Sequence, residues 1–214
     1  MTVAAGAGNR RLGVLISGRG SNLKAIIDAI RDGRLNAEVS VVISNREDVE
    51  GLAHARRAGI ETLCLNHRGW ENRDAYDAAL AHELHARRVR LVCLAGFMRL
   101  VGRPLIDAFP NAILNIHPSL LPAFPGLDAQ RQALEHGVKV SGVTVHLVTP
   151  ELDAGPIIVQ RAVPVLDDDT EDTLAVRILE QEHRVYPEAI GLVLDGEWRV
   201  AGRRVVRRRD AASV

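Results

Sequence analysis

The sequence RLGVLISGRGSNLKAIIDAIRDG, residues 11–33, joins a short apolar run to an amphipathic stretch through a glycine-containing turn. The apolar run over 11–18 includes β-branched residues, which is typical of a buried strand. Over 22–33 apolar residues recur every three or four positions, and Gly33 closes the stretch. That spacing predicts a helix followed by a glycine, so the segment as a whole predicts one strand–helix unit.

The same unit repeats along the first half of the chain. Further apolar runs lie at 37–45, 61–65, 89–96 and 111–117. Between the first three of these lie two stretches with helical spacing, at 48–59 and 71–88. Strands separated by helices pair in parallel, because each helix carries the chain back across one face of the sheet. We therefore expect an α/β fold with a doubly wound, mostly parallel sheet, and ligands at the carboxyl ends of its strands.

After residue 117 the pattern changes. A proline-rich loop leads to a short predicted helix over 128–137. Residues 140–165 alternate apolar and polar side chains, which predicts two strands joined by a loop around 149–156. A long helix is predicted over 169–196, opened by Asp169 or Thr170. We expect this part of the chain to add antiparallel strands to the sheet.

The composition is that of a globular protein. The chain has 214 residues, of which 47% are apolar, and its 27 basic residues balance 27 acidic ones. This neutrality argues against a protein that grips nucleic acid, and no apolar run approaches the roughly 20 residues that cross a bilayer. The first residues lack a secretory pattern, so we expect a cytoplasmic protein. We expect a single domain over 1–214, with residues 1–10 and about 208–214 flexible.

Several other features have plain structural interpretations. Cys64 and Cys93 each lie in an apolar run and are interpreted as small buried residues. His82 and His85 indicate a solvated helix face, and without an HExxH motif or a third ligand we predict no metal site. RNA binding by the C-terminal arginines is an alternative, but a charged edge strand and tail explains them better. These arginines are Arg199, Arg203, Arg204, Arg207, Arg208 and Arg209.

The turn over 17–23, SGRGSNL, joins the first predicted strand to its helix. Glycines at such a turn let backbone N–H groups approach an anion at the helix N-terminus. The turn is not a Walker A motif, and Leu23 breaks the dinucleotide fingerprint, so a phosphate fits better than a dinucleotide. The alternative is an ordinary turn in which Ser21 or Asn22 caps the helix.

Polar side chains interrupt the apolar run at 111–117. Asn115 and His117 share one strand face at the ligand-bearing edge, where an amide and an imidazole could stabilise an oxyanion. Thr144 and His146 share a face of a later strand. Asp153 follows in a tight loop, where a carboxylate near an imidazole would favour the protonated ring. The alternatives are a structural histidine and an aspartate that merely shapes a turn.

Four motifs occur in order: LISGRGSNL (15–23), LAGFMR (94–99), NIHPSLLP (115–122) and ELDAGP (151–156). Together they resemble the phosphoribosylglycinamide formyltransferase family, the folate-dependent formyltransferases of purine synthesis. The resemblance runs from about residue 11 to about 196 and implies a Rossmann-like formyltransferase fold. Arg19 stands where many relatives carry another residue, often Asn.

The resemblance also implies roles for individual residues. The phosphate of glycinamide ribonucleotide would be held by Gly20, Ser21 and Asn22, and its ribose or amine would lie near Gln181 and Glu182. The catalytic residues would be Asn115, His117 and Asp153, supported by Thr144 and His146. The folate site would comprise Arg73, Met98, Arg99, Leu100, Val101, Asn115, Thr149, Pro150, Glu151, Leu152 and Asp153.

The implied reaction is formyl transfer from 10-formyltetrahydrofolate, as co-substrate, to the amine of glycinamide ribonucleotide, without a metal. Asn115 and protonated His117 would stabilise the oxyanion, and Asp153 would assist proton transfer. The alternatives are another formyl-folate enzyme, such as a hydrolase, and a non-catalytic phosphate- or nucleotide-binding protein. We expect small-molecule substrates, no nucleic acid or membrane partner, and a monomer or homodimer.

Overall fold

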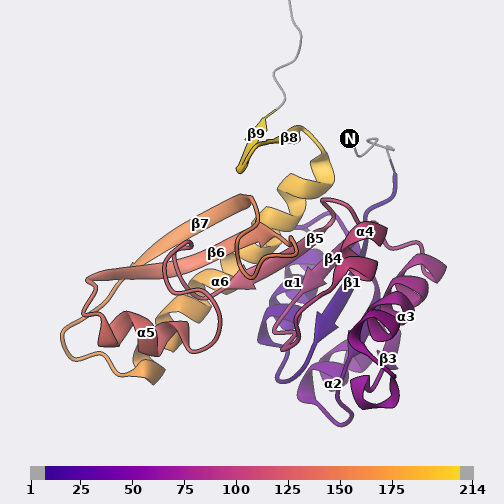
Figure 1. Ribbon diagram of the computed structural model, residues 1–214, viewed down its shortest axis with the longest axis horizontal. Helices are drawn as coiled ribbons and strands as arrows, with labels where there is room; N and C mark the ends of the chain where they lie inside the picture. The colour runs from indigo at the N-terminus through magenta and orange to yellow at the C-terminus, as the bar shows by residue number, and fades with distance from the viewer. Residues whose placement is uncertain (1–7, 208–214) are drawn as a thin grey trace, which may run out of the picture.

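One sheet of nine strands organises residues 8–207, the part of the chain that the computed structural model describes (Figure 1). The strand order is β3-β2-β1-β4-β5-β6-β7-β9-β8. The first five strands pair in parallel, as predicted. They are β1 (Arg11–Ile16), β2 (Glu38–Ser44), β3 (Thr62–Cys64), β4 (Leu91–Leu94) and β5 (Ile113–His117).

Helices cover both faces of this parallel part, which confirms the doubly wound architecture. The helices are α1 (Ser21–Arg31), α2 (Glu50–Arg57), α3 (Arg73–Ala86), α4 (Arg103–Ala108), α5 (Ala129–Glu135) and α6 (Glu171–Asp195). Alternation along β1 sends Leu12, Val14 and Ile16 into a core shared with α1, α2 and α6. The opposite face packs Leu15 into a second core, formed with α3 and α4.

The C-terminal half extends the sheet with antiparallel strands, as expected. Strand β6 (Val140–Leu147) pairs antiparallel with both β5 and β7 (Ile157–Pro164). Strands β8 (Trp198–Ala201) and β9 (Arg204–Arg207) form a hairpin that meets β7 at Ile157. Figure 1 shows α6 running along the sheet toward that hairpin. Thr170 caps α6 through a hydrogen bond from the N–H of Thr173, which selects one of the two predicted caps.

The structure differs from the sequence-based expectations at a few positions. Helix α4 and the 3₁₀ turn η1 (His67–Gly69) were not predicted, because each is too short to show a periodic pattern. Cys93 is buried, but Cys64 is only half-buried because β3 is an edge strand. The N-cap of α1 is Gly20, without a side-chain cap, so neither Ser21 nor Asn22 caps that helix.

Some expectations concern the chain ends. Residues 1–7 and 208–214, where flexibility was expected, lie outside the described residues, as do Arg208 and Arg209. Asn9 and Arg10 are described, and both make hydrogen bonds to other parts of the chain. Across residues 8–207 none of the helices combines the length and apolar character that crossing a membrane requires.

Candidate active site

The predicted catalytic residues meet where β5 and β6 lie side by side. In the antiparallel register Asn115 faces His146, and His117 faces Thr144. The loop between β6 and β7 carries Asp153 back over this pair of strands. Asp153 Oδ2 lies 3.4 Å from His117 Nδ1, and its Oδ1 lies 3.6 Å from His146 Nε2. Asn115 Nδ2 lies 3.5 Å from Asp153 Oδ1 and 3.2 Å from His146 Nε2.

Asp153 is held by contacts that are remote in sequence. Its carboxylate accepts the backbone N–H of Gly126 at 2.8 Å. Its backbone has a φ of 48°, in the left-handed region. The loop can turn tightly because Gly155 has no Cβ. A Cβ at this position would lie 1.7 Å from the carbonyl oxygen of Leu147 and would clash with it. A carboxylate that bonds partners 27 and 38 residues away is placed for a site rather than for its own turn.

The charge state of His117 departs from the expectation. Burial lowers its pKa, and this outweighs the carbonyl of Phe124 and the carboxylate of Asp153, which both favour the charged ring. Burial therefore favours the neutral ring at rest, whereas the sequence-based expectation was an imidazolium. His117 Nε2 lies 2.8 Å from the Phe124 oxygen, while Nδ1 faces Asp153. Since both nitrogens face oxygen atoms, taking up a proton would satisfy both contacts at once.

Asp153 keeps a lowered pKa although it is buried. Burial alone would raise the pKa, but the His146 ring 3.6 Å away, the Gly126 N–H and the neighbouring His117 ring together lower it. The carboxylate is therefore ionised near neutral pH. A neutral buried imidazole beside a buried carboxylate is an arrangement that can accept one proton during a reaction.

Thr144 supports the site indirectly. Its Oγ1 donates to the carbonyl of Ser119 at 2.7 Å and accepts from the N–H of Leu121 at 3.0 Å. Gln160 on β7 donates to the same oxygen at 3.0 Å. Thr144 therefore fixes the proline-rich loop that follows His117. This loop carries Phe124, whose carbonyl oxygen contacts Nε2 of His117. Gln160 was not predicted.

The glycine-containing loop after β1 has the conformation expected of an anion-binding turn. Gly20 has a φ of 73°, and the N-terminus of α1 follows directly. Gly51 at the start of α2 packs against this loop and donates its N–H to the carbonyl of Gly18 at 3.1 Å. A Cβ on Gly20 would lie 2.6 Å from the Cα of Gly51. Gly51 was missed, although a glycine in the first turn of a predicted helix is a usable signal. Arg19 is exposed.

Asn22 and Glu182 form a buried pair beside this loop. Asn22 Nδ2 donates to Glu182 Oε2 at 2.6 Å, which links α1 to α6. Burial raises the pKa of Glu182, and the hydrogen bond from Asn22 partly offsets the shift. Asn22 Oδ1 is buried without a partner in the structure, which leaves an acceptor at the helix terminus. Gln181 is half-buried next to Glu182.

The residues expected to bind folate lie on two loops, at the start of α3 and, for Asn115, in β5. Residues 98–101 follow β4, and 149–153 follow β6. Met98, Leu100 and Leu152 are exposed, and exposed apolar side chains of this kind are typical of a ligand-binding surface. Arg99 is half-buried, with its guanidinium 5.3 Å from the ring centroid of Tyr76. The remaining members are Arg73, Pro150 and Glu151, which are exposed, and Val101 and Thr149, which are half-buried.

The two substrate loops are joined by Ser17. Its backbone N–H donates to the carbonyl of Gly96 at 3.1 Å, and its Oγ accepts the N–H of Met98 at 2.8 Å. Because Ser17 directly precedes the glycine loop, the predicted phosphate and folate segments lie next to one another. Over residues 8–207 no group of three or more His, Cys, Asp or Glu side chains is arranged to hold a metal ion.

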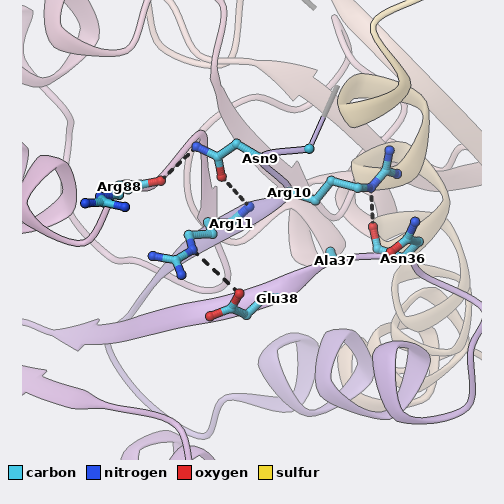
Figure 2. Close-up of a pocket in the computed structure, with 8 residues that line it drawn as sticks. Asn9, Arg10, Arg11, Asn36, Ala37, Glu38 and Arg88 are labelled. Atoms are coloured by element: carbon cyan, nitrogen blue, oxygen red, sulfur yellow. Dashed lines mark hydrogen bonds and ion pairs between the residues drawn. The ribbon is translucent and has the colours of Figure 1, made fainter. Parts of the chain in front are cut away.

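An open pocket lies at the other end of the strands (Figure 2). It is open, about 530 Å³ in volume, and lies around the amino ends of β1 and β2. Arg11 and Glu38 face one another there at 3.6 Å, and Arg10 donates to the carbonyl of Asn36. None of its lining residues is a candidate site residue. Since ligands of such sheets bind at the carboxyl ends of the strands, we place the active site at that end.

Comparisons with known proteins agree with this geometry. A family model described as formyl transferase matches residues 10–190. The chain is 48% identical over 183 residues to the phosphoribosylglycinamide formyltransferase of Escherichia coli (strain K12), covering 86% of both proteins. It is also 50% identical over 189 residues to the trifunctional purine biosynthetic protein adenosine-3 of Drosophila melanogaster, which spans 87% of this chain but only 14% of that protein.

A solved structure is similar over nearly the whole chain. Glycinamide ribonucleotide transformylase 1 from Symbiobacterium toebii superposes with a TM-score of 0.92 at 60% identity, covering 94% of this chain and 95% of that one. Residues 10–190, which the family model matches, include both candidate substrate loops and the three predicted catalytic residues. The chain therefore belongs to the formyl transferase family.

Proposed function

We propose that the protein transfers the formyl group of 10-formyltetrahydrofolate to the amine of glycinamide ribonucleotide, in purine biosynthesis. The observation that carries this proposal is the meeting of Asn115, His117 and Asp153 at the carboxyl edge of the sheet, where the folate and phosphate loops are joined. The names of the relatives support the same reaction.

The glycine loop accounts for the acceptor. Backbone N–H groups of Gly20, Ser21 and Asn22 begin an 11-residue helix, where they and the helix dipole favour a phosphate. The buried carboxyl of Glu182 lies against Asn22, so it is near enough to the same substrate to receive a ribose hydroxyl or the amine. Gln181 is its neighbour on α6 and completes this part of the proposed site.

The folate donor would lie across the two exposed loops. Apolar side chains of Met98, Leu100 and Leu152 would cover its rings, and the cationic Arg73 and Arg99 would favour its carboxylates. The formyl group would then reach the edge of β5. Binding both substrates next to one another makes the attack effectively intramolecular.

The chemistry is acyl transfer through a tetrahedral intermediate. The amine nitrogen attacks the formyl carbon, and the electron pair of the carbonyl bond moves to oxygen. Asn115 donates from Nδ2 to the oxyanion. The neutral His117 ring takes up the proton that the attacking amine releases, so the resulting imidazolium also stabilises the oxyanion before the proton passes on. The intermediate collapses when the bond to the folate nitrogen breaks. Asp153, ionised at rest, relays the proton from the attacking amine to that leaving nitrogen, through water.

An assay of acceptors tests this proposal. Purified protein is given 10-formyltetrahydrofolate with glycinamide ribonucleotide, with water alone, or with charged initiator tRNA. We expect formyl transfer to glycinamide ribonucleotide to exceed the other two reactions by orders of magnitude. Faster release of formate would identify a hydrolase, and binding of the ribonucleotide without turnover would identify a non-catalytic protein.

The predictions of a cytoplasmic location and of a monomer or homodimer stay predictions.

A further inference from the structure

The segment between β4 and α4, residues 95–102, lacks regular structure yet carries four of the eleven proposed folate residues. Met98 and Leu100 expose 63% and 58% of their surface, so packing of their side chains does not hold the segment. A loop that binds a rigid ligand must nevertheless be fixed before binding, since ordering it afterwards weakens affinity. The contacts that fix this loop are therefore of functional interest.

Two buried polar side chains hold the two ends of the segment. At one end Ser17 Oγ accepts the N–H of Met98 at 2.8 Å, and Ser17 in turn donates to Asn45 Oδ1 at 2.6 Å. At the other end Asp77 Oδ2 accepts the N–H of Gly102 at 2.5 Å. Asp77 comes from α3, and only 1% of its surface is exposed. A buried carboxylate is costly unless it is well paired, so a structural side chain would more often be apolar at this place.

Gly102 fits this contact for a steric reason. Its φ of −97° and ψ of 179° are open to any residue, so backbone conformation does not require glycine. A Cβ at this position would lie 2.8 Å from Asp77 Oδ2. The close approach of the carboxylate to the backbone N–H is therefore what excludes a side chain at residue 102.

Charge links the same carboxylate to the proposed folate residues. Burial raises the pKa of Asp77, and the Gly102 N–H and the guanidinium groups of Arg73 and Arg99 oppose that rise. Arg99 lies over the ring of Tyr76, the neighbour of Asp77 on α3. Asp77 Oδ2 and Arg73 Nε both approach Gly102, at 2.8 and 3.3 Å from the position that its Cβ would take.

We infer that Asp77 is a positioning residue for the folate donor, which acts by holding residues 98–102 through the Gly102 N–H. This inference rests on the proposed function, because it takes that segment as the folate site. It concerns the donor alone, so it separates the two substrates. Loss of the anchor should weaken donor binding and leave the acceptor loop, which α1 and α2 form, unchanged.

Steady-state kinetics of Asp77→Ala and Asp77→Asn test the inference. For Asp77→Ala we expect the KM for the formyl-folate donor to rise about tenfold or more, as loss of a charge-assisted hydrogen bond predicts. The KM for glycinamide ribonucleotide and kcat at saturation should change less than about threefold. Asp77→Asn keeps an acceptor oxygen and should recover part of the loss. The control is Asp107→Asn, which neutralises an exposed carboxylate on the adjacent α4 and should leave all three constants unchanged.

Gly102→Ala tests the same contact from the other partner and remains usable if Asp77→Ala fails to fold. It should raise the donor KM selectively, because the methyl group displaces the loop from the carboxylate. In the double variant with Asp77→Ala the two effects should be smaller than their sum, since the obstacle is gone. Equilibrium titration with 5-formyltetrahydrofolate, a stable isomer of the donor, gives a readout independent of turnover.

The outcomes separate the two proposals. If the wild-type protein shows no transfer from 10-formyltetrahydrofolate to glycinamide ribonucleotide, the proposed function fails. If the wild type is active but folded Asp77→Ala and Gly102→Ala retain the wild-type donor KM, the anchor is wrong and the function stands. Equal weakening of both substrates would also overturn the inference, because it would indicate a general structural role.

Discussion

At the scale of single residues, the site depends on a buried imidazole and a buried carboxylate whose pKa values move in the same direction. The pKa of His117 falls because burial opposes its charge, and the pKa of Asp153 falls because its hydrogen bonds favour its charge. The resting pair is therefore one neutral base and one anion. Such a pair can hold a proton that arrives during the reaction, which a pre-formed ion pair could not do.

Strand alternation was enough to predict that Asn115 and His117 share a face, and the structure confirms it. The place of Asp153 beside them came from the family resemblance, because spacing alone left a turn-forming aspartate open. The backbone groups of Phe124 and Gly126 that hold this pair could not be predicted. Every residue carries such groups, so no residue type in the sequence marks the contact.

Removal of either His117 or Asp153 should affect turnover more than binding. For His117→Ala and Asp153→Asn we expect kcat to fall by about a hundred- to a thousandfold, on the order of 3 kcal/mol, with small changes in both KM values. Steady-state kinetics measure this directly. His82→Ala, at an exposed histidine of α3, is the control and should behave as the wild type. Near-normal kcat in folded His117→Ala would remove this residue from the mechanism.

The lowered pKa of His117 also predicts how stability depends on pH. The unfolded ring has a pKa near 6.5 and the folded ring a lower one, so the unfolded state binds more protons as the pH falls. The stability associated with the neutral His117 ring is fully present above pH 6.5 and is lost as the pH falls toward the pKa of the folded ring. We expect the free energy of unfolding in urea to drop less for His117→Gln than for the wild type between about pH 7.5 and about pH 5.5. Equal drops would show that His117 is not held neutral.

At the scale of elements, periodicity predicted the long helices and the buried strands, because each buries one face or one run of apolar residues. It missed α4, whose six residues make fewer than two turns. It also misplaced the cap of α1: a polar side chain after a glycine resembles a cap, but Asn22 bonds Glu182 instead. Local sequence patterns do not predict contacts between elements that are far apart in the sequence, such as this one.

The packing of α2 against the glycine loop makes a prediction at this scale. A Cβ on Gly51 would lie 2.5 Å from Ile16 Cδ1 and 3.0 Å from the Gly18 oxygen, so Gly51→Ala should displace the loop. We expect the KM for glycinamide ribonucleotide to rise and stability to fall by about 1–3 kcal/mol, with the donor KM unchanged. The matched control is Gly191→Ala in α6, where a Cβ would meet only Leu35 at 3.8 Å. An unchanged acceptor KM in folded Gly51→Ala would contradict the role of this contact.

At the scale of the whole molecule, the parallel half supplies the proposed acceptor loop and the antiparallel addition supplies His146 and Asp153. The proposed catalytic residues therefore meet where the two halves join, between β5 and β6. The order of elements predicted this architecture. Strands that alternate with helices form a parallel sheet, whereas the two successive strands predicted over 140–165 have no helix between them and can pair antiparallel. The register of β6 on β5, which brings His146 opposite Asn115, required the structure.

The central claim is that one reacting carbonyl lies between these halves, with the acceptor phosphate on the glycine loop. A crystal structure with glycinamide ribonucleotide and a non-reactive folate analogue tests it most directly. We predict the phosphate at the N–H groups of residues 20–22, and the formyl-equivalent oxygen within about 3 Å of Asn115 Nδ2 and beside His117. A phosphate bound elsewhere, or a carbonyl remote from residues 115, 117 and 153, would contradict the account.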